Sequence, residues 1–318
     1  MRGTTRRSAA RRGLLVLAAS SVGTAVGCGG PEFADPTEEG DRLTLGGLVY
    51  IILHDNLEQA ETCGPDYATT LELDRDRFVR TFDHAISEDI VDASIRMLRD
   101  QQQVSSGRPF FLYLPFGAPH CPFHAPPEFI DRYAGRFDDG WDLHRRATYE
   151  RQLEMGIITK GTDLPPPSNA VPAWDSLDVD AQRLYARLQE TFCGFVDHTD
   201  AQIGRLMDAL HEMGITDDTA VIFLSDNGAS AEGGKHGTTN TERFRNMMFM
   251  EVDEMLDDIP HMGSRHTDPH YPIGWSQAGN APFQRWKRDT HRGGNTDPMI
   301  VHWPAQIPDA DRGAIRTQ

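Results

Sequence analysis

Lysine is scarce in this 318-residue chain, which contains only Lys160, Lys235 and Lys287. Acidic residues outnumber basic ones, and the net charge of −17 argues against the basic face that non-specific nucleic-acid binding requires. The four cysteines include no Cys-x-x-Cys pair, which argues against a structural zinc site. The sequence has no internal repeat. Its 38% of hydrophobic residues is enough for a sizeable core, in one large domain or two ordinary ones.

A long apolar segment is also missing from the N-terminus, where the apolar residues 14–26 are too few to span a bilayer. A basic start followed by a short apolar run predicts an export signal, and Arg11-Arg12 resembles a twin-arginine signal. The four residues ending at Cys28 resemble a lipoprotein cleavage box, and the alternative is a chance cysteine beside a plain cleavage site. We expect residues 1–28 to be an export signal of the lipoprotein type. The protein would then be periplasmic or outer-surface, and would touch the membrane only through lipid on Cys28.

The remaining chain divides into a tether and a folded part. Residues 29–43 are polar with Gly and Pro, which indicates a tether, and residues 44–318 carry the α/β domain. Once Cys28 is set aside, an odd number of cysteines is left, so at most one disulfide forms and its pairing stays open. These cysteines are Cys63, Cys121 and Cys193.

Strand-like and helix-like segments alternate along the folded part. Short apolar runs predict four buried strands, at residues 45–53, 108–116, 219–226 and 297–304. Helical spacing of apolar residues predicts helices from Ser87 as N-cap to about residue 102, and over 181–213 before Gly214. This alternation predicts an α/β fold with a mostly parallel sheet sandwiched by helices. In such sheets ligands bind beyond the carboxyl ends of the strands.

Asp226 and Asn227 stand at the end of the strand expected over 219–226, and Gly228 follows them. A carboxylate and an amide oxygen are hard ligands suited to Ca²⁺ or Mg²⁺, and the glycine lets the chain turn tightly past a bound ion. The same three residues are also common turn chemistry, so an Asx turn that caps the strand is an equal alternative.

Two more polar motifs carry candidate chemistry. His120 follows the strand at 108–116 in a proline-rich loop, which suits a general acid or an anion contact. A surface histidine, or a two-histidine metal site with His124, are the alternatives. Lys287 lies in a local basic cluster of an acidic chain, which suggests an anionic ligand, although a solvated face is the better explanation for the neighbouring arginines. A divalent cation, a histidine and a lysine that meet at an anion would fit hydrolysis of a sulfate or phosphate ester.

Several separated stretches over roughly residues 80–307, including "PFFLYLPFGAPHCPFHAP", "VIFLSDNGASAEGG" and "GNAPFQRWKRDTHRGG", resemble bacterial arylsulfatases. These are formylglycine-dependent enzymes of the alkaline-phosphatase-like superfamily. The resemblance implies that Asp226 and Asn227 bind the active-site Ca²⁺. It further implies that His120 contacts the sulfate group and the departing oxygen, and that Lys287 touches the sulfate. The implied partner is a small-molecule or glycan sulfate ester.

Other parts of the arylsulfatase pattern are missing from this sequence. We find no strand ending in an Asp-Asp pair, no Cys-x-Pro/Ala-x-Arg signature for the formylglycine nucleophile, and no Lys-x-His stretch. Cys63 begins Cys-Gly-Pro-Asp-Tyr, with Tyr67 where the arginine belongs, so it does not meet the signature. We therefore expect a sulfatase core that lacks the nucleophile segment and the C-terminal subdomain, and doubtful activity for this chain. The alternatives are a phosphoesterase or phosphonate hydrolase of the same superfamily, or a non-catalytic degenerate lipoprotein.

Overall fold

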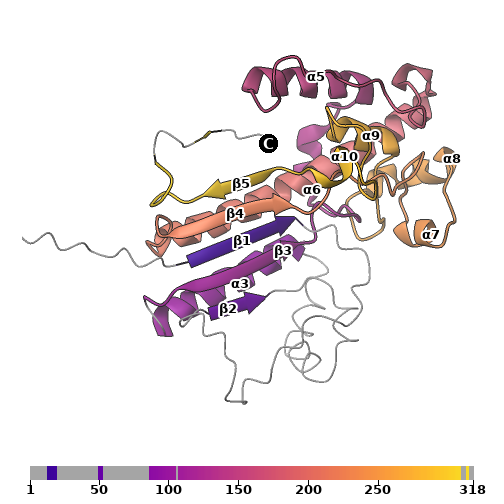
Figure 1. The fold of residues 1–318 in the computed structure, drawn as a ribbon. Coiled ribbons are helices and arrows are strands. Elements are labelled where there is room, and N and C mark those ends of the chain that lie inside the picture. Colours follow the sequence, from indigo (N-terminus) through magenta and orange to yellow (C-terminus); the bar gives the residue numbers. More distant parts are fainter. Residues whose placement is uncertain (1–12, 20–48, 53–85, 105–106, 309–312, 315–318) are drawn as a thin grey trace, which may run out of the picture.

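A computed structural model of the chain describes residues 13–19, 49–52, 86–104, 107–308 and 313–314. Its sheet has five strands in the order β2-β3-β1-β4-β5. The strands β1 to β4 run parallel, and β5 runs antiparallel to β4 at one edge (Figure 1). The strands are β1 (Gly13–Ala19), β2 (Val49–Ile52), β3 (Phe110–Phe116), β4 (Thr219–Ser225) and β5 (Met299–His302). The predicted mostly parallel α/β sheet is confirmed.

The centre of the sheet differs from the sequence expectation. Strand β1 pairs with β3 on one side and β4 on the other, and Leu15 and Leu17 are fully buried or nearly so. These residues belong to the segment expected as an export signal, and in this structure they form the central strand of the sheet. A seven-residue apolar run has the length and composition of a buried parallel strand as well as of a signal segment. The expected tether at 29–43 and the residues Cys28 and Cys63 lie outside the described residues.

Two long helices, α3 (Ile86–Val104) and α6 (Val179–Glu212), pack against each other on one face of the sheet (Figure 1). Their contact is partly polar, because the fully buried His198 Nε2 lies 2.9 Å from Glu88 Oε1. Ser87 was expected as an N-cap, but it lies inside α3, and its hydroxyl meets that of Thr199 at 3.3 Å. That prediction was wrong because a serine before an apolar helical pattern also suits a polar contact between helices.

The remaining helices surround the carboxyl ends of the parallel strands (Figure 1). They are α4 (Pro127–Ile130), α5 (Gly140–Met155), α7 (Thr241–Arg245), α8 (Val252–Met255), α9 (Ile273–Gly279) and α10 (Arg292–Asn295). A cluster of tryptophans fixes α9: Trp275 packs edge-on against Trp141 at 5.8 Å, and its indole N–H donates to the Tyr185 carbonyl at 2.9 Å. This anchoring matters for function because the chain that leaves α9 carries Lys287.

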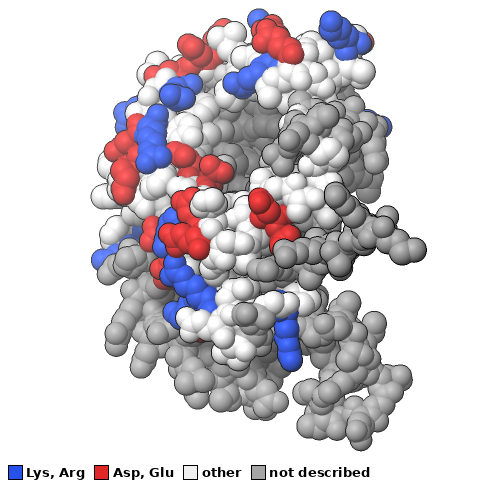
Figure 2. Space-filling model, turned by 90° about the vertical axis from the view of Figure 1, so that its left-hand side faces the viewer, with Lys and Arg blue, Asp and Glu red and all other residues white. Residues whose placement is uncertain are grey.

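Strand β5 was expected to be buried, and its four residues are exposed instead. Its apolar sequence correctly predicted a strand, but an edge strand is buried only if another element covers it. Figure 2 shows the side of the molecule on which the parallel strands begin. Acidic and basic side chains are interspersed on this side. Within the described residues, no helix combines the length and apolar character needed to cross a membrane.

Candidate active site

His120 lies at the carboxyl edge of the sheet, four residues beyond the end of β3. Its ring Nδ1 is 2.6 Å from the carbonyl oxygen of Cys121. Because a carbonyl only accepts hydrogen bonds, Nδ1 carries the proton, and Nε2 of the neutral ring is an acceptor. Burial lowers the pKa of His120, and the nearby charge of Lys287 lowers it further against the opposing effect of the Cys121 carbonyl. The ring is therefore neutral at pH 7, and its Nε2 accepts a hydrogen bond from Lys287 Nζ at 3.2 Å.

Lys287 completes this pair from a segment 167 residues away in the sequence. Its Nζ lies 3.2 Å from His120 Nε2 and donates to Glu232 Oε2 at 2.8 Å. The backbone holds the lysine in place, since Lys287 N–H donates to the carbonyl of Ala229 at 3.0 Å. Only 13% of the lysine side chain is exposed, so the ammonium group is held in a largely buried position.

Glu232 lies on the loop that follows β4 and closes the cluster. Ser230 Oγ lies 3.1 Å from Glu232 Oε2, and the backbone N–H of Glu232 donates to the same hydroxyl at 3.1 Å. His270 Nε2 contacts Ser230 Oγ at 3.1 Å, and burial lowers the pKa of His270 to about 3. Burial alone would raise the pKa of Glu232, but the hydrogen bond and charge of Lys287 outweigh it and lower the pKa. Glu232 is therefore a carboxylate at neutral pH.

The segment Asp226-Asn227-Gly228 leaves β4 at the same edge of the sheet. Asn227 Nδ2 donates to the neighbouring Asp226 Oδ1 at 2.8 Å. A Cβ on Gly228 would lie 1.8 Å from the carbonyl oxygen of Gly293, so glycine is required by the close approach of two backbones. This packing is a reason for glycine here beside the tight turn that the sequence predicts.

Asp297 is a further carboxylate at this place. The register that pairs Leu224 with Met299 sets Asp226 opposite Asp297 when it is continued by two residues. Burial raises the pKa of Asp297, and the charge of Asp226 raises it further. Asp226, Asn227 and Asp297 thus bring hard oxygen donors together, which suits Ca²⁺ or Mg²⁺ in kind. They fall short of the about six to eight oxygens that Ca²⁺ takes. Among the described residues, no cluster of three or more His, Cys, Asp or Glu is arranged to hold a metal.

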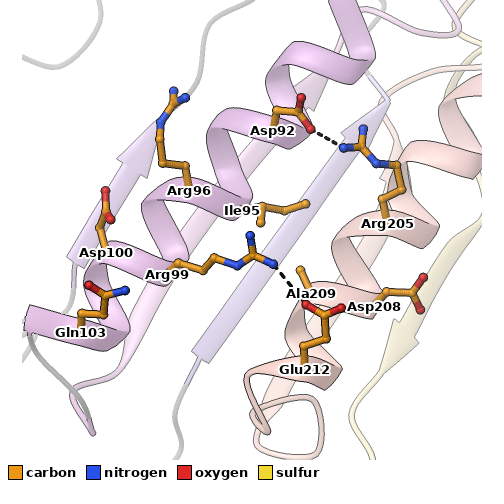
Figure 3. A pocket seen from close by; sticks show the side chains of 10 residues that line it. All are labelled: Asp92, Ile95, Arg96, Arg99, Asp100, Gln103, Arg205, Asp208, Ala209 and Glu212. Atoms are coloured by element: carbon orange, nitrogen blue, oxygen red, sulfur yellow. Dashed lines mark hydrogen bonds and ion pairs between the residues drawn. The ribbon is translucent and has the colours of Figure 1, made fainter.

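A groove lined by charged side chains lies elsewhere, away from these residues. It has a volume of about 560 Å³ and runs between α3 and α6 (Figure 3). Arginines and carboxylates from the two helices line it, and they pair across it, Arg205 with Asp92 and Arg99 with Glu212. These pairs are about half exposed, where an ion pair contributes little, so the groove is a solvated helix–helix boundary.

The family model described as sulfatase matches residues 50–317, which is most of the chain. The chain belongs to the sulfatase family. An uncharacterised sulfatase of Schizosaccharomyces pombe is 32% identical over 219 residues, covering 68% of this chain and 38% of that protein. An arylsulfatase of Klebsiella aerogenes is 32% identical over 196 residues, covering 61% of this chain and 40% of the relative. This sulfatase chain therefore spans about two fifths of the length of these relatives.

Among solved structures, that of Ps i-CgsB in complex with k-i-k-neocarrahexaose is similar to this sulfatase chain, with 21% sequence identity and a TM-score of 0.36. The match covers 70% of this chain and 29% of that one.

In this sulfatase chain the structure brings two of the predicted site residues, His120 and Lys287, into contact. Asp226 and Asn227 lie on the loop whose Ala229 holds the Lys287 backbone. His124 does not join His120, because its Nε2 lies 2.9 Å from the Thr267 carbonyl on another loop.

Sequence reasoning missed three residues of this region. Glu232 is the single acidic residue in the small-residue run after Asn227, which was a usable signal. Ser230 and Asp297 gave no signal, because their positions depend on the path of the loop and on the antiparallel direction of β5.

Proposed function

We propose that this chain binds the sulfate group of an ester against Lys287 and His120, and that it hydrolyses sulfuric ester bonds. The observation that carries the proposal is the 3.2 Å contact of Lys287 Nζ with His120 Nε2, at the edge of the sheet where such folds bind ligands. An ammonium group that is largely withdrawn from water attracts an anion far more strongly than an exposed one. The arylsulfatase of Klebsiella aerogenes supports a sulfate ester of the aryl type as substrate.

The two side chains have separate roles in this proposal. Lys287 contacts the sulfate oxygens and stabilises the charge that builds up on the departing oxygen. His120 Nε2 has no proton of its own, because Nδ1 carries it toward the Cys121 carbonyl. A proton that reaches the leaving oxygen through His120 therefore originates on Lys287, which already faces Nε2.

The nucleophile limits the rate of the proposed reaction. This sequence contains no Cys-x-Pro/Ala-x-Arg signature, and Cys121 is no substitute because burial raises the pKa of its thiol to about 12. The proposed attacking group is then water, positioned beside a bound sulfate, and turnover would be far below that of a covalent mechanism. The same observation favours a second candidate function, binding of a sulfated ligand without turnover.

We propose that Asp226 and Asn227, together with Asp297, hold a divalent cation, with Ca²⁺ as the favoured ion. The support is the chemistry of the donors, two carboxylates and an amide oxygen, and their juxtaposition by the β4–β5 register. Such an ion supplies positive charge that polarises a sulfate oxygen when it is bound. Since two carboxylates and one amide supply at most about five oxygens, fewer than the about six to eight that Ca²⁺ takes, we expect weak binding.

Hydrolysis of a chromogenic aryl sulfate, with and without Ca²⁺, tests the proposal. We expect Lys287→Ala to lower kcat/KM by about 100-fold, as removal of one preorganised donor does. His120→Ala should lower it as well, and Lys160→Ala, which removes an exposed lysine, is the matched control. Sulfate binding without hydrolysis would favour the non-catalytic candidate. Faster cleavage of the corresponding phosphate ester would favour a phosphoesterase of the same superfamily.

We also propose that residues 1–28 direct export and that Cys28 carries lipid. The support is the basic and apolar order of the segment and the cleavage box before the cysteine. Cleavage before Cys28 would remove β1 from between β3 and β4. Intact-mass measurement of the protein from its membrane and soluble fractions decides whether the segment is retained. A full-length, unmodified N-terminus would refute this proposal.

A further inference from the structure

Glu232 is a carboxylate in direct contact with Lys287. The distance from Lys287 Nζ to Glu232 Oε2 is 2.8 Å, and 24% of the glutamate side chain is exposed. Arg288 approaches the other oxygen, Oε1, at 3.8 Å, although that arginine is 75% exposed. The Lys287 ammonium group, which we propose binds the sulfate, is therefore already in contact with an anionic oxygen of Glu232.

The Glu232 oxygen already uses one of the N–H donors of Lys287 that a ligand oxygen would need. Lys287 Nζ donates to Glu232 on one side and to His120 Nε2 on the other. A sulfate group that uses both Lys287 and His120 must place an oxygen beside the same ammonium group. A bound sulfate and the Glu232 carboxylate would carry like charges a few ångströms apart, which is unfavourable in a partly buried site.

The loop holds Glu232 in this place by contacts of its own. Ser230 Oγ lies 3.1 Å from Glu232 Oε2, and it accepts from the Glu232 backbone N–H at 3.1 Å. His270 in turn contacts Ser230 Oγ at 3.1 Å and is buried behind it. These contacts hold the Glu232 carboxylate against the Lys287 ammonium group.

We propose that Glu232 is a built-in competitor for the anion site, so that sulfate or a sulfate ester binds at Lys287 only by displacing the Glu232 carboxylate. The proposal rests on the proposed function, because it takes Lys287 and His120 as the anion-binding pair. It adds an autoinhibitory contact that sets the affinity of the site. A glutamate that merely positions Lys287 would have the opposite effect, since its loss would free the lysine and weaken anion binding.

Isothermal titration calorimetry with sodium sulfate on the full chain, at pH 7.5 and matched ionic strength, separates these roles. Glu232→Gln keeps the shape and removes the charge, and we expect it to tighten sulfate binding by about tenfold or more. Glu232→Ala should tighten binding in the same direction if charge is the cause. Glu212→Gln is the matched control, because Glu212 also pairs with an arginine, Arg99 at 3.1 Å, but lies in the α3–α6 groove (Figure 3).

The pattern of outcomes keeps this proposal apart from the proposed function. Tighter binding in both Glu232 variants, lost again when Lys287→Met is added, supports the competitor role. Equal or weaker binding in Glu232→Gln, with wild-type binding that depends on Lys287, overturns the competitor role and leaves the anion site intact. Failure of sulfate to bind to wild type and to both Glu232 variants, all with wild-type melting temperatures, overturns the anion site and the competitor together.

Discussion

Gly228→Ala adds only a methyl group, but we expect it to lower the free energy of unfolding substantially. The added Cβ would lie 1.8 Å from the carbonyl oxygen of Gly293, and that atom belongs to a backbone that cannot rotate away. The two segments must separate to relieve this contact. Their separation would break the bonds from Gly228 N–H to the Gly294 carbonyl (3.3 Å) and from Asn280 Nδ2 to the Gly293 carbonyl (2.9 Å).

The expected cost follows from the number of bonds at risk. Besides the two hydrogen bonds above, a third is at risk, from Lys287 N–H to the neighbouring Ala229 carbonyl at 3.0 Å. Each buried hydrogen bond contributes about 0.5–1.5 kcal/mol, so the loss of three destabilises the chain by about 1.5–4.5 kcal/mol. At roughly 2 °C per kcal/mol for a chain of this size, the melting temperature should fall by about 3–9 °C.

Thermal melts followed by circular dichroism measure this effect, with Gly204→Ala as the matched control. Gly204 lies in the middle of α6, and a Cβ there meets nothing within 4 Å. Alanine is favoured over glycine inside a helix by about 0.5–1 kcal/mol, so the control should melt slightly higher than wild type. If Gly228→Ala melts with wild type while Gly204→Ala shifts upward, the close approach of the two loops is wrong. Sulfate binding should weaken in Gly228→Ala, because the same loops place Lys287.

Three further predictions follow from buried or paired titratable groups. Since the pKa of His270 falls from 6.5 to about 3, its contribution to stability is complete above about pH 6.5 and is lost as the pH drops toward 3. Denaturant unfolding at pH 5 should show about 2 kcal/mol of this loss, and His270→Asn should lack it. Asp297→Asn should raise the melting temperature in EDTA, because it relieves repulsion with Asp226. The same substitution should reduce the increase in melting temperature that Ca²⁺ produces. If neither melting temperature changes, Asp226 and Asp297 do not lie side by side. Burial raises the pKa of the Cys121 and Cys193 thiols to about 12, so a variant with its other two cysteines replaced by serine should react slowly with a thiol reagent at pH 8 until it is unfolded.

The elements nearest to the candidate site were predictable from local pattern. The apolar runs at 108–116 and 219–226 became β3 and β4, and the helical spacing over 181–213 became α6. These predictions succeeded because a buried strand and an amphipathic helix each need a local run of apolar residues with a fixed period. Burial of the fourth strand was predicted wrongly, because exposure of β5 depends on the elements around it and not on its own residues.

The residue pattern alone was sufficient for the α/β class and for the strands β3 and β4, and its motifs identified the sulfatase family. Each of these is written in segments shorter than about 20 residues, where neighbours along the chain decide the conformation. Only the tertiary structure shows that residues 13–19 lie between β3 and β4. It also brings Lys287 into contact with His120, which is 167 residues away in the sequence. Folding also placed Glu232 on Lys287 at 2.8 Å, a contact that depends on how two loops pack. Side chains so far apart in sequence become neighbours only through the packing of whole elements, and no local pattern records it.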